Sequence, residues 1–226
     1  MATAVLPRPT PSFLLAPPGV YRPQHDTRLL TRALCREGVA PGSEVLDLGT
    51  GTGALSVAAA RLGARVTAVD ISWRAVLTAR LNALAARQHV VVHRGDLTDA
   101  VPGRSFDLVV SNPPYVPSPT DRLPRRGPAR SWDAGRDGRA LVDRICDGAP
   151  SALRAGGVLL LVHSGLCGTD ATLERLERAG MKATVTDRVL IPLGPVLRSR
   201  LPWLRHEGLM AEENEEEVVV VRAEHA

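Results

Sequence analysis

Three glycines and a later carboxylate have the spacing of a nucleoside site. Residues 45–53 read VLDLGTGTG, an apolar run that leads through Gly49, Gly51 and Gly53 into an alanine-rich segment. Such glycines let the backbone approach a ligand closely, and the amides at the start of a following helix are free to bind it. Asp70 ends the next apolar run, 21 residues after Gly49, where a carboxylate accepts hydrogen bonds from ribose hydroxyls. This combination predicts a bound nucleoside.

Two kinds of nucleoside ligand fit this pattern. Gly49, Gly51 and Ala54 also match the looser dinucleotide fingerprint G-x-G-x-x-G/A, so a nicotinamide cofactor is the alternative. Asp47 favours S-adenosyl-L-methionine, because a carboxylate beside the glycines repels a pyrophosphate but accepts a hydrogen bond from an α-amino group. We therefore expect S-adenosyl-L-methionine as the cofactor. Asp96 and Leu97 follow a third apolar run, within reach of an adenine amino group.

The segment Asn112-Pro-Pro-Tyr115 follows a fourth apolar run and predicts the acceptor site. Two prolines remove two backbone donors and fix the loop, so its carbonyl groups can only accept hydrogen bonds. The Asn112 side-chain oxygen and the Pro113 carbonyl are expected to hold both hydrogens of a planar NH2 group, with Tyr115 stacked on its plane. Amide and exocyclic amine nitrogens are weak nucleophiles that need positioning more than a strong base. We expect Asn112, Pro113 and Tyr115 to be catalytic.

The elements that must position these residues alternate along the chain. Apolar runs predict seven strands, and segments with helical spacing lie between them. The expected strands are 44–48, 65–70, 90–94, 106–111, 157–162, 183–190 and 217–222, and the expected helices are 27–37, 54–62, 73–87, 141–154 and 170–179. This order predicts an α/β fold with a doubly wound, mostly parallel seven-stranded sheet. The turn-rich connection 191–214 predicts that the last two strands form an antiparallel hairpin.

Length and composition agree with one domain. The chain has 226 residues, of which 44% are hydrophobic and 23% charged, values typical of a globular protein. Prolines crowd the start, so residues 1–18 are expected to be a disordered tail and residues 19–226 a single methyltransferase domain. Three widely spaced cysteines suggest neither a disulfide framework nor a metal site, and no apolar run is long enough to span a membrane. A cytoplasmic location fits best.

These motifs resemble the HemK-type class I S-adenosylmethionine-dependent methyltransferases, the release-factor glutamine N5-methyltransferase family. The resemblance rests on DLGTGTG and NPPY, supported by residues 20–27 (VYRPQHDT) and 132–138 (WDAGRDG), and extends over about residues 20 to 222. It implies the Rossmann-like class I fold and methylation of a glutamine side-chain amide. It also implies residue roles: Thr27, Asp47, Gly49, Gly51, Gly53, Asp70, Asp96, Leu97 and Asn112 bind the cofactor, and Tyr21, Pro114, Tyr115 and Trp132 bind the substrate. Asp26 would close over the donor together with Thr27.

Only about 48 residues precede Gly49, which leaves no room for the helical N-terminal domain of the bacterial enzymes of this family. The chain is therefore similar to the short, eukaryotic-type relatives, which act on a release-factor glutamine, have a reported role on a histone lysine, and use a small activator subunit. That similarity implies a protein substrate, such as a release factor, and an activator partner.

Alternatives to a glutamine acceptor remain open. An adenine amino group in DNA or RNA also offers a planar NH2, although the small size and the net charge of +4 favour a protein acceptor. Lysine methylation and a non-catalytic binding module are further alternatives, and intact Asp47, Asp70 and Asn112 oppose the latter. Arg122, Arg125, Arg126 and Arg130 follow the acceptor motif and are expected to form a solvated face or to grip an acidic protein surface or RNA phosphates.

Overall fold

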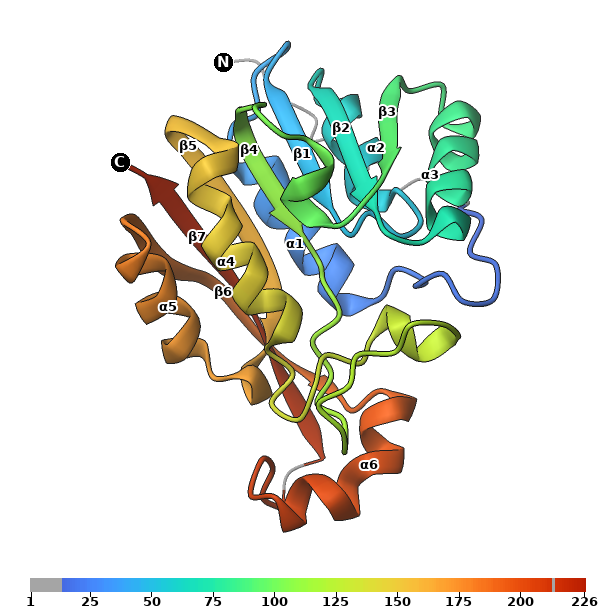
Figure 1. The fold of residues 1–226 in the computed structure, drawn as a ribbon, viewed down its shortest axis with the longest axis vertical. Helices are drawn as coiled ribbons and strands as arrows, with labels where there is room; N and C mark the ends of the chain where they lie inside the picture. The colour runs from blue at the N-terminus through green and yellow to red at the C-terminus, as the bar shows by residue number, and fades with distance from the viewer. Residues whose placement is uncertain (1–13, 213) are drawn as a thin grey trace, which may run out of the picture.

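The computed structural model describes residues 14–212 and 214–226 and contains one seven-stranded sheet (Figure 1). The strand order is β3-β2-β1-β4-β5-β7-β6. Strands β1 to β5 run parallel to one another, and β7 runs antiparallel to both β5 and β6. The strands are β1 (Glu44–Leu48), β2 (Arg65–Asp70), β3 (Val90–Arg94), β4 (Phe106–Ser111), β5 (Leu153–Ser164), β6 (Met181–Pro192) and β7 (Glu215–His225).

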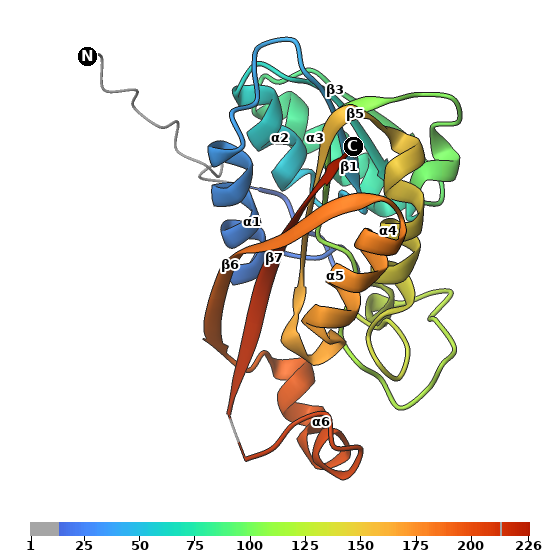
Figure 2. The ribbon, with the colours of Figure 1, turned by 90° about the vertical axis from the view of Figure 1, so that its left-hand side faces the viewer.

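Six α-helices accompany the sheet in the described residues: α1 (His25–Arg36), α2 (Ala54–Arg61), α3 (Trp73–Ala85), α4 (Ala140–Ala152), α5 (Thr169–Arg178) and α6 (Pro195–His206). Figure 2 shows the sheet between two layers, with α1, α2 and α3 on one side and α4 and α5 on the other. Short 3-10 helices cover Leu97–Ala100, Pro128–Ser131 and Gly165–Cys167. This arrangement confirms the doubly wound α/β fold with a C-terminal antiparallel pair.

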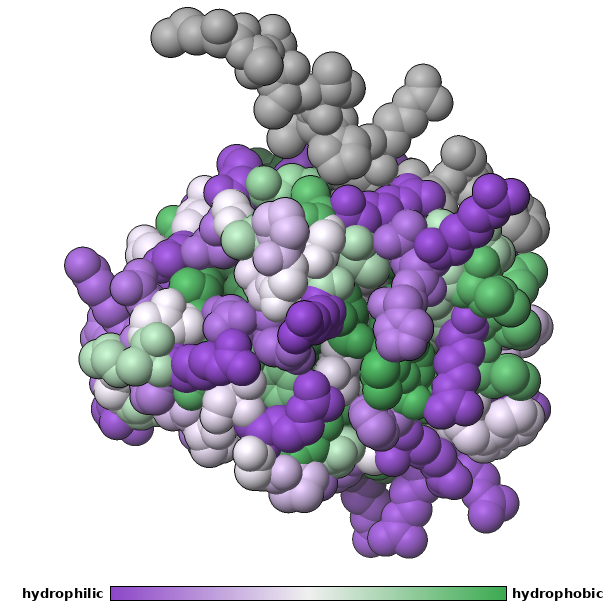
Figure 3. All heavy atoms as spheres, turned by 90° about the horizontal axis from the view of Figure 1, so that it is seen from above, coloured by the Kyte–Doolittle hydropathy of each residue, from purple (hydrophilic) through white to green (hydrophobic). Residues whose placement is uncertain are grey.

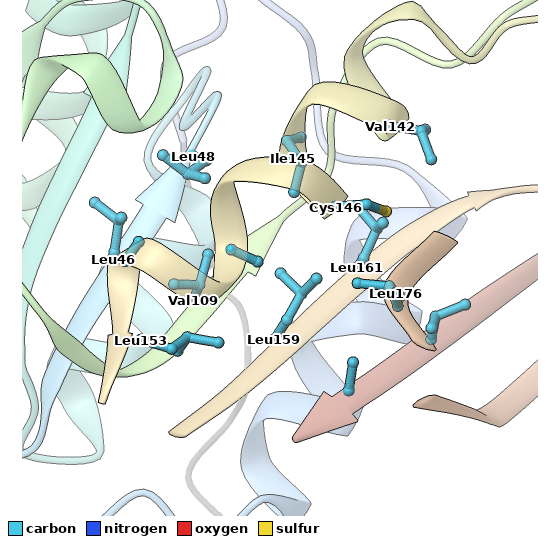
Figure 4. Close-up of a cluster of buried hydrophobic side chains, with 14 of the residues drawn as sticks. Leu46, Leu48, Val109, Val142, Ile145, Cys146, Leu153, Leu159, Leu161 and Leu176 are labelled. Atoms are coloured by element: carbon cyan, nitrogen blue, oxygen red, sulfur yellow. The ribbon is translucent and has the colours of Figure 1, made fainter. Parts of the chain in front are cut away.

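Each central strand contributes side chains to two hydrophobic clusters, because successive side chains point to opposite faces of the sheet. On β1, Leu46 packs into the cluster under α4 and α5, whereas Val45 packs into the cluster under α1 and α2. Figure 4 shows the first cluster, in which Ile145 and Cys146 of α4 lie over Leu159 and neighbouring leucines of the sheet. Burial on both faces explains why these strands are nearly continuous apolar runs.

The segment 191–214, which was predicted to be a turn-rich connection, contains helix α6. Pro195 stands in its first turn, where a missing amide costs nothing, and Pro202 lies within it. Leu197 and Leu204 are buried in a separate small cluster. The packing of these leucines offsets the unfavourable proline in the helix interior. No helix in the described part of the chain is long and apolar enough to cross a membrane.

The start of the described chain packs against α3. The backbone N–H of Leu15 donates to Oδ1 of Asn82 at 2.8 Å, and its carbonyl accepts from Nδ2 at 2.9 Å. The ordered contacts therefore begin before residue 19, because the side-chain amide of Asn82 satisfies an extended backbone that has no strand partner. Residues 1–13 of the expected tail lie outside the described residues, so the division into tail and single domain stays a prediction.

Candidate active site

The carboxyl ends of β1, β2 and β4 open into a cavity of about 1600 Å³. This is the edge of an open α/β sheet at which ligands bind. Most of the predicted cofactor residues line the cavity: Thr27, Gly49, Gly51, Asp70, Asp96, Leu97 and Asn112. Asp47 and Gly53 do not line it.

Asp70 fixes the glycine turn to the neighbouring strand. Its Oδ2 accepts from the Gly51 amide at 3.0 Å, and its Oδ1 accepts from the Ser72 amide at 2.8 Å. Burial raises the pKa of this carboxyl, and the two backbone donors together with the positive charge of Arg130 oppose that rise. The carboxylate thus stands at the cavity wall with both oxygens oriented, where it can also accept from the hydroxyls of a ribose.

Asp47, which was predicted to bind the donor, lies behind the glycine turn. It is fully buried, and its Oδ2 accepts from the Thr50 hydroxyl at 2.6 Å and from the Ser56 amide at 3.1 Å. Burial raises its pKa to about 6, and its Oδ1 has no partner among the described residues. In this structure, Asp47 holds the glycine turn to the start of α2 from below and does not face the cavity.

Gly53 also has a packing role. Its φ is +79°, and a Cβ on it would lie 3.1 Å from both Cα and Cβ of Ala79 in α3. By contrast, a Cβ on Gly49, whose φ is +71°, would meet nothing within 4 Å. Gly53 therefore allows two helices to approach, whereas Gly49 leaves the cavity wall open for a ligand.

The adenine end of the expected donor site contains Asp96 and Leu97. Oδ2 of Asp96 accepts from Nη2 of Arg144 at 3.0 Å. Leu97 has a φ of +47°, an uncommon conformation for a residue with a side chain that often marks functional sites. Both residues line the cavity at its edge near α4.

A buried carboxylate orients the acceptor motif. Asp26 is 2% exposed, and its Oδ2 accepts from Nδ2 of Asn112 at 3.1 Å. The same nitrogen donates to Oγ1 of Thr27 at 3.1 Å. Both donor hydrogens of the Asn112 amide are thereby engaged. Its oxygen stays available to accept hydrogen bonds at the cavity wall.

Both tyrosines of the chain meet at the same oxygen of Asp26. The hydroxyl of Tyr21 donates to Oδ2 at 2.7 Å, and that of Tyr115 donates at 3.0 Å. Burial, and then the negative charge of Asp26, raise the pKa of each phenol well above its ordinary value. Both tyrosines consequently remain protonated donors. The sequence did not predict that these two hydroxyls share one acceptor oxygen, because no sequence pattern links residues 21, 26 and 115.

A second, smaller cavity of about 40 Å³ adjoins the first. It is lined by Tyr21, Asp26, Asn112, Pro113, Pro114, Tyr115, Val116, Ser131 and Trp132, so it contains every residue expected to bind the acceptor. A space of this size holds about three water-sized groups, which is the number of heavy atoms in a carboxamide. Asn112 lines both cavities and stands at the boundary between them.

Helix α6 and strand β7 support this end of the site. Arg200 of α6 donates to the Pro117 carbonyl at 2.8 Å and pairs with Asp133 at 2.7 Å, fixing the loop that follows Tyr115. Glu216 of β7 is 6% exposed, and its Oε1 has no partner within the described part of the chain. Burial raises the pKa of Glu216 to about 7, and the charge of Asp26 contributes.

The described residues fit S-adenosyl-L-methionine. Glycine-lined open space lies against β1, an oriented carboxylate is available for a ribose, and Asn112 stands at the far wall. The nicotinamide alternative has less support, because the negative charge of buried Asp47 lies beneath the turn at which a pyrophosphate would bind.

Comparisons with known proteins agree with this geometry. The family model described as Methyltransferase small domain matches residues 14–122. A Methanocaldococcus jannaschii protein named as a protein N5-glutamine methyltransferase is 34% identical over 176 residues, which cover 77% of this chain and 87% of that protein. The release factor glutamine methyltransferase of Xylella fastidiosa is 38% identical over 188 residues, which cover 80% of this chain and 68% of the relative.

Among solved structures, a chain of the E. cuniculi Mtq2–Trm112 complex, responsible for methylation of the translation termination factor eRF1, is 27% identical with a TM-score of 0.65. The match covers 92% of this chain and 99% of that chain. The predicted resemblance is confirmed by these relatives, and the protein is a methyltransferase. On the strength of its fold, its NPPY corner and its similarity over most of its length, the chain belongs to the protein N5-glutamine methyltransferase family.

Proposed function

We propose that this protein transfers a methyl group from S-adenosyl-L-methionine to the side-chain amide of a glutamine in a release factor. The observation that carries the proposal is the orientation of Asn112. Its nitrogen is engaged by Asp26 and Thr27, so its oxygen is the group available to the acceptor. A glutamine amide is the planar NH2 group that this oxygen and the Pro113 carbonyl can hold together.

The protein promotes the transfer mainly by positioning the target nitrogen and less by acid–base chemistry. A target nitrogen held by two acceptors lies in the small cavity, with its reactive face toward the large one. Tyr115 and Trp132 enclose it and exclude water, while the Asp26 hydrogen bonds prevent Asn112 from rotating. When bound, S-adenosyl-L-methionine would supply an electrophilic methyl group on a sulfonium; transfer would break the carbon–sulfur bond, leave the neutral thioether S-adenosylhomocysteine and release one proton from the acceptor nitrogen. Positioning of this kind accounts for a large part of the barrier reduction in transfers to weak nucleophiles.

The donor would lie along the glycine turn. Asp70 would accept from the ribose hydroxyls, and Asp96 with Leu97 would contact the adenine. Thr27, whose hydroxyl accepts from Asn112, would lie near the methionine end. The proposed substrate would place the reaction in the cytoplasm, where translation ends.

The direct test uses purified chain, labelled donor and the release factors of its own source organism. We expect one methyl group on one glutamine of a release factor, located by peptide mass spectrometry, and no label on the same factor with that glutamine replaced by alanine. Label on a lysine, or on DNA or RNA instead, would contradict the glutamine assignment and support the corresponding alternative.

We also propose a small activator subunit, by analogy with the Mtq2–Trm112 neighbour. Helix α3 exposes an apolar stripe consisting of Trp73, Leu77, Leu81 and Leu84, and Val91 is exposed on the adjacent edge strand β3. In Figure 3, apolar residues gather at the right-hand edge, the side on which Figure 1 places α3 and β3. Patches of this kind mark interaction sites.

The stripe continues toward the donor cavity, which Trp73 also lines. A subunit covering the stripe would therefore support the donor site directly. The test is donor affinity, measured by calorimetry, with and without a purified homologue of the small subunit. We expect tighter donor binding in the complex and loss of that effect in Leu81→Arg. Equal affinity in both would contradict the role of the subunit.

A further inference from the structure

The large cavity carries more positive charge than its donor needs. Seven arginines and three aspartates line it, with no lysine or glutamate among the described lining residues. The arginines are Arg74, Arg94, Arg122, Arg125, Arg126, Arg130 and Arg144. Four of them belong to the short segment 122–130.

Few of these charges are neutralised. Asp96 pairs with Arg144, and Asp133 pairs with Arg200, which lies outside the cavity. Asp70 is engaged by two backbone amides. Among the described residues, the other six arginines of the lining make no ion pair. The charge of Arg130 acts on the nearby Asp70 carboxylate, and the other five arginines leave the rim with an excess of positive charge.

The donor does not explain this rim. S-adenosylmethionine has a positive sulfonium, a positive amino group and one carboxylate, so it carries a net positive charge. A concentration of like charge around it opposes binding. One arginine is enough for its carboxylate, so the donor does not account for the remaining positive charge.

The segment 122–130 is built to present its arginines at the acceptor side. Pro124 and Pro128 restrict its backbone, and Nη1 of Arg130 donates to the Arg125 carbonyl at 3.2 Å. Ser131, which follows directly, lines both cavities. Arg122, Arg125 and Arg126 are exposed and line the large cavity, on the side that adjoins the small one through Ser131.

Two classes of polyanion fit an arginine rim, and the structure favours one. Proteins that bind single-stranded RNA stack its bases on exposed aromatic side chains. Residues 116–131 contain no aromatic residue, and the flanking Tyr115 and Trp132 are buried and half-buried beside the small cavity. The small cavity also matches a carboxamide better than a purine. We propose, on the basis of the proposed function, that Arg122, Arg125 and Arg126 bind carboxylates of an acidic protein segment that flanks the target glutamine.

The test measures peptide binding by fluorescence anisotropy in the presence of S-adenosylhomocysteine. The probes are three labelled peptides with one central glutamine, flanked by four glutamates, four serines or four lysines. The protein variants are Arg122→Gln/Arg125→Gln/Arg126→Gln and a matched control, Arg61→Gln/Arg178→Gln/Arg198→Gln, whose arginines are exposed and line neither cavity.

We expect the acidic peptide to bind most tightly, the rim variant to weaken that binding about tenfold, and added salt to remove most of the difference. The control variant should bind the acidic peptide as tightly as wild type. The donor dissociation constant of the rim variant should stay equal or fall, because the removed charges oppose the cationic donor. Equal affinity for the three peptides, or an equal loss in both variants, would overturn the proposal, as would tighter binding of a single-stranded RNA oligonucleotide. Methylation of the release-factor glutamine is measured separately, so the function and the rim can fail independently.

Discussion

The side-chain nitrogen of Asn112 donates a hydrogen bond to Oδ2 of Asp26, at 3.1 Å and across 86 residues of chain. This bond joins the loop after β4 to the first turn of α1, two segments that enclose the acceptor pocket from opposite sides. Because Oδ2 also accepts from Tyr21 and Tyr115, one buried carboxylate fixes three side chains of the site. The acceptor pocket depends on the position of the Asp26 carboxylate and not on its acidity.

Replacing Asp26 by asparagine tests this positioning role. The variant keeps the volume but offers an NH2 group toward donors, so Asn112 loses the acceptor that sets its orientation. We expect kcat to fall about 100-fold, with donor affinity within threefold of wild type by calorimetry. Rescue by Asp26→Glu is not expected, since the longer side chain displaces Oδ2. A kcat within twofold of wild type would show that Asn112 is oriented by other contacts.

The Asn112→Ala substitution removes the proposed acceptor of the target amide. We expect turnover to fall by about 1000-fold or more, while the donor dissociation constant stays nearly unchanged. The contrast matters because Asn112 also lines the donor cavity. A large loss of donor affinity with a normal residual rate would assign Asn112 to the donor and contradict its role toward the acceptor.

Local sequence signals predicted the fold closely. The strands 44–48, 65–70, 90–94 and 106–111 have the expected bounds to the residue, because each is an apolar run limited by glycine, proline or charged residues. β6 and β7 extend beyond their expected bounds, because their antiparallel pairing continues through polar residues. β5 also extends, at its start through the parallel pair of Leu153 with Phe106 of β4 and at its end through pairing with β7. That extension depends on a partner distant in sequence, which local patterns do not contain.

The site was predicted less completely, for the same reason. The glycine turn, Asp70 and Asn112 each belong to a continuous motif, and they do gather at one cavity. Asp47 belongs to the same motif, but its direction depends on the strand pleat and on Ser56, so it lies beneath the turn. The contact of Asp26 with Tyr115 joins segments 89 residues apart and follows only from the folded chain.

Asp70→Ala should weaken donor binding about tenfold to 100-fold, in line with about 1.5–3 kcal/mol for hydrogen bonds to a charged group. The turnover number at saturating donor should change little. Because Asp70 also holds the amides of Gly51 and Ser72, thermal unfolding of the variant is measured in parallel. An unchanged donor affinity in calorimetry would remove Asp70 from the ribose contact.

Gly49→Ala and Gly53→Ala form a matched pair that separates binding from folding. Both positions have positive φ, so each variant bears a backbone strain of about 1–2 kcal/mol. Gly53→Ala adds a clash with Ala79 and should lower the melting temperature further than Gly49→Ala, by several degrees. Gly49→Ala should instead reduce donor affinity by tenfold or more, since its methyl group enters the cavity. Equal effects of the two variants on stability and binding would refute this division.

Glu216→Gln should change the pH dependence of stability. The pKa of buried Glu216 is raised from 4.5 to about 7, so between these values the folded protein holds a proton that the unfolded chain has released. Stability from this group is complete below pH 4.5 and is lost as pH rises through 7, by at most roughly 3 kcal/mol. The amide variant has no such loss. In urea unfolding, the free energy of unfolding of the variant relative to wild type should therefore rise steadily between pH 5 and pH 8.

The matched control for this measurement is Glu217→Gln, the neighbouring residue whose side chain is exposed and pairs with Arg188 at 2.9 Å. Asp47, whose raised pKa lies in the same interval, is present in all three proteins and cancels in the differences. Glu216→Gln should diverge from wild type as pH rises and Glu217→Gln should not, because Glu216, unlike Glu217, has a buried oxygen without a partner in the described residues and the charge of Asp26 nearby. Parallel stability curves for wild type and Glu216→Gln would show that Glu216 ionises in the folded protein as it does in the unfolded chain.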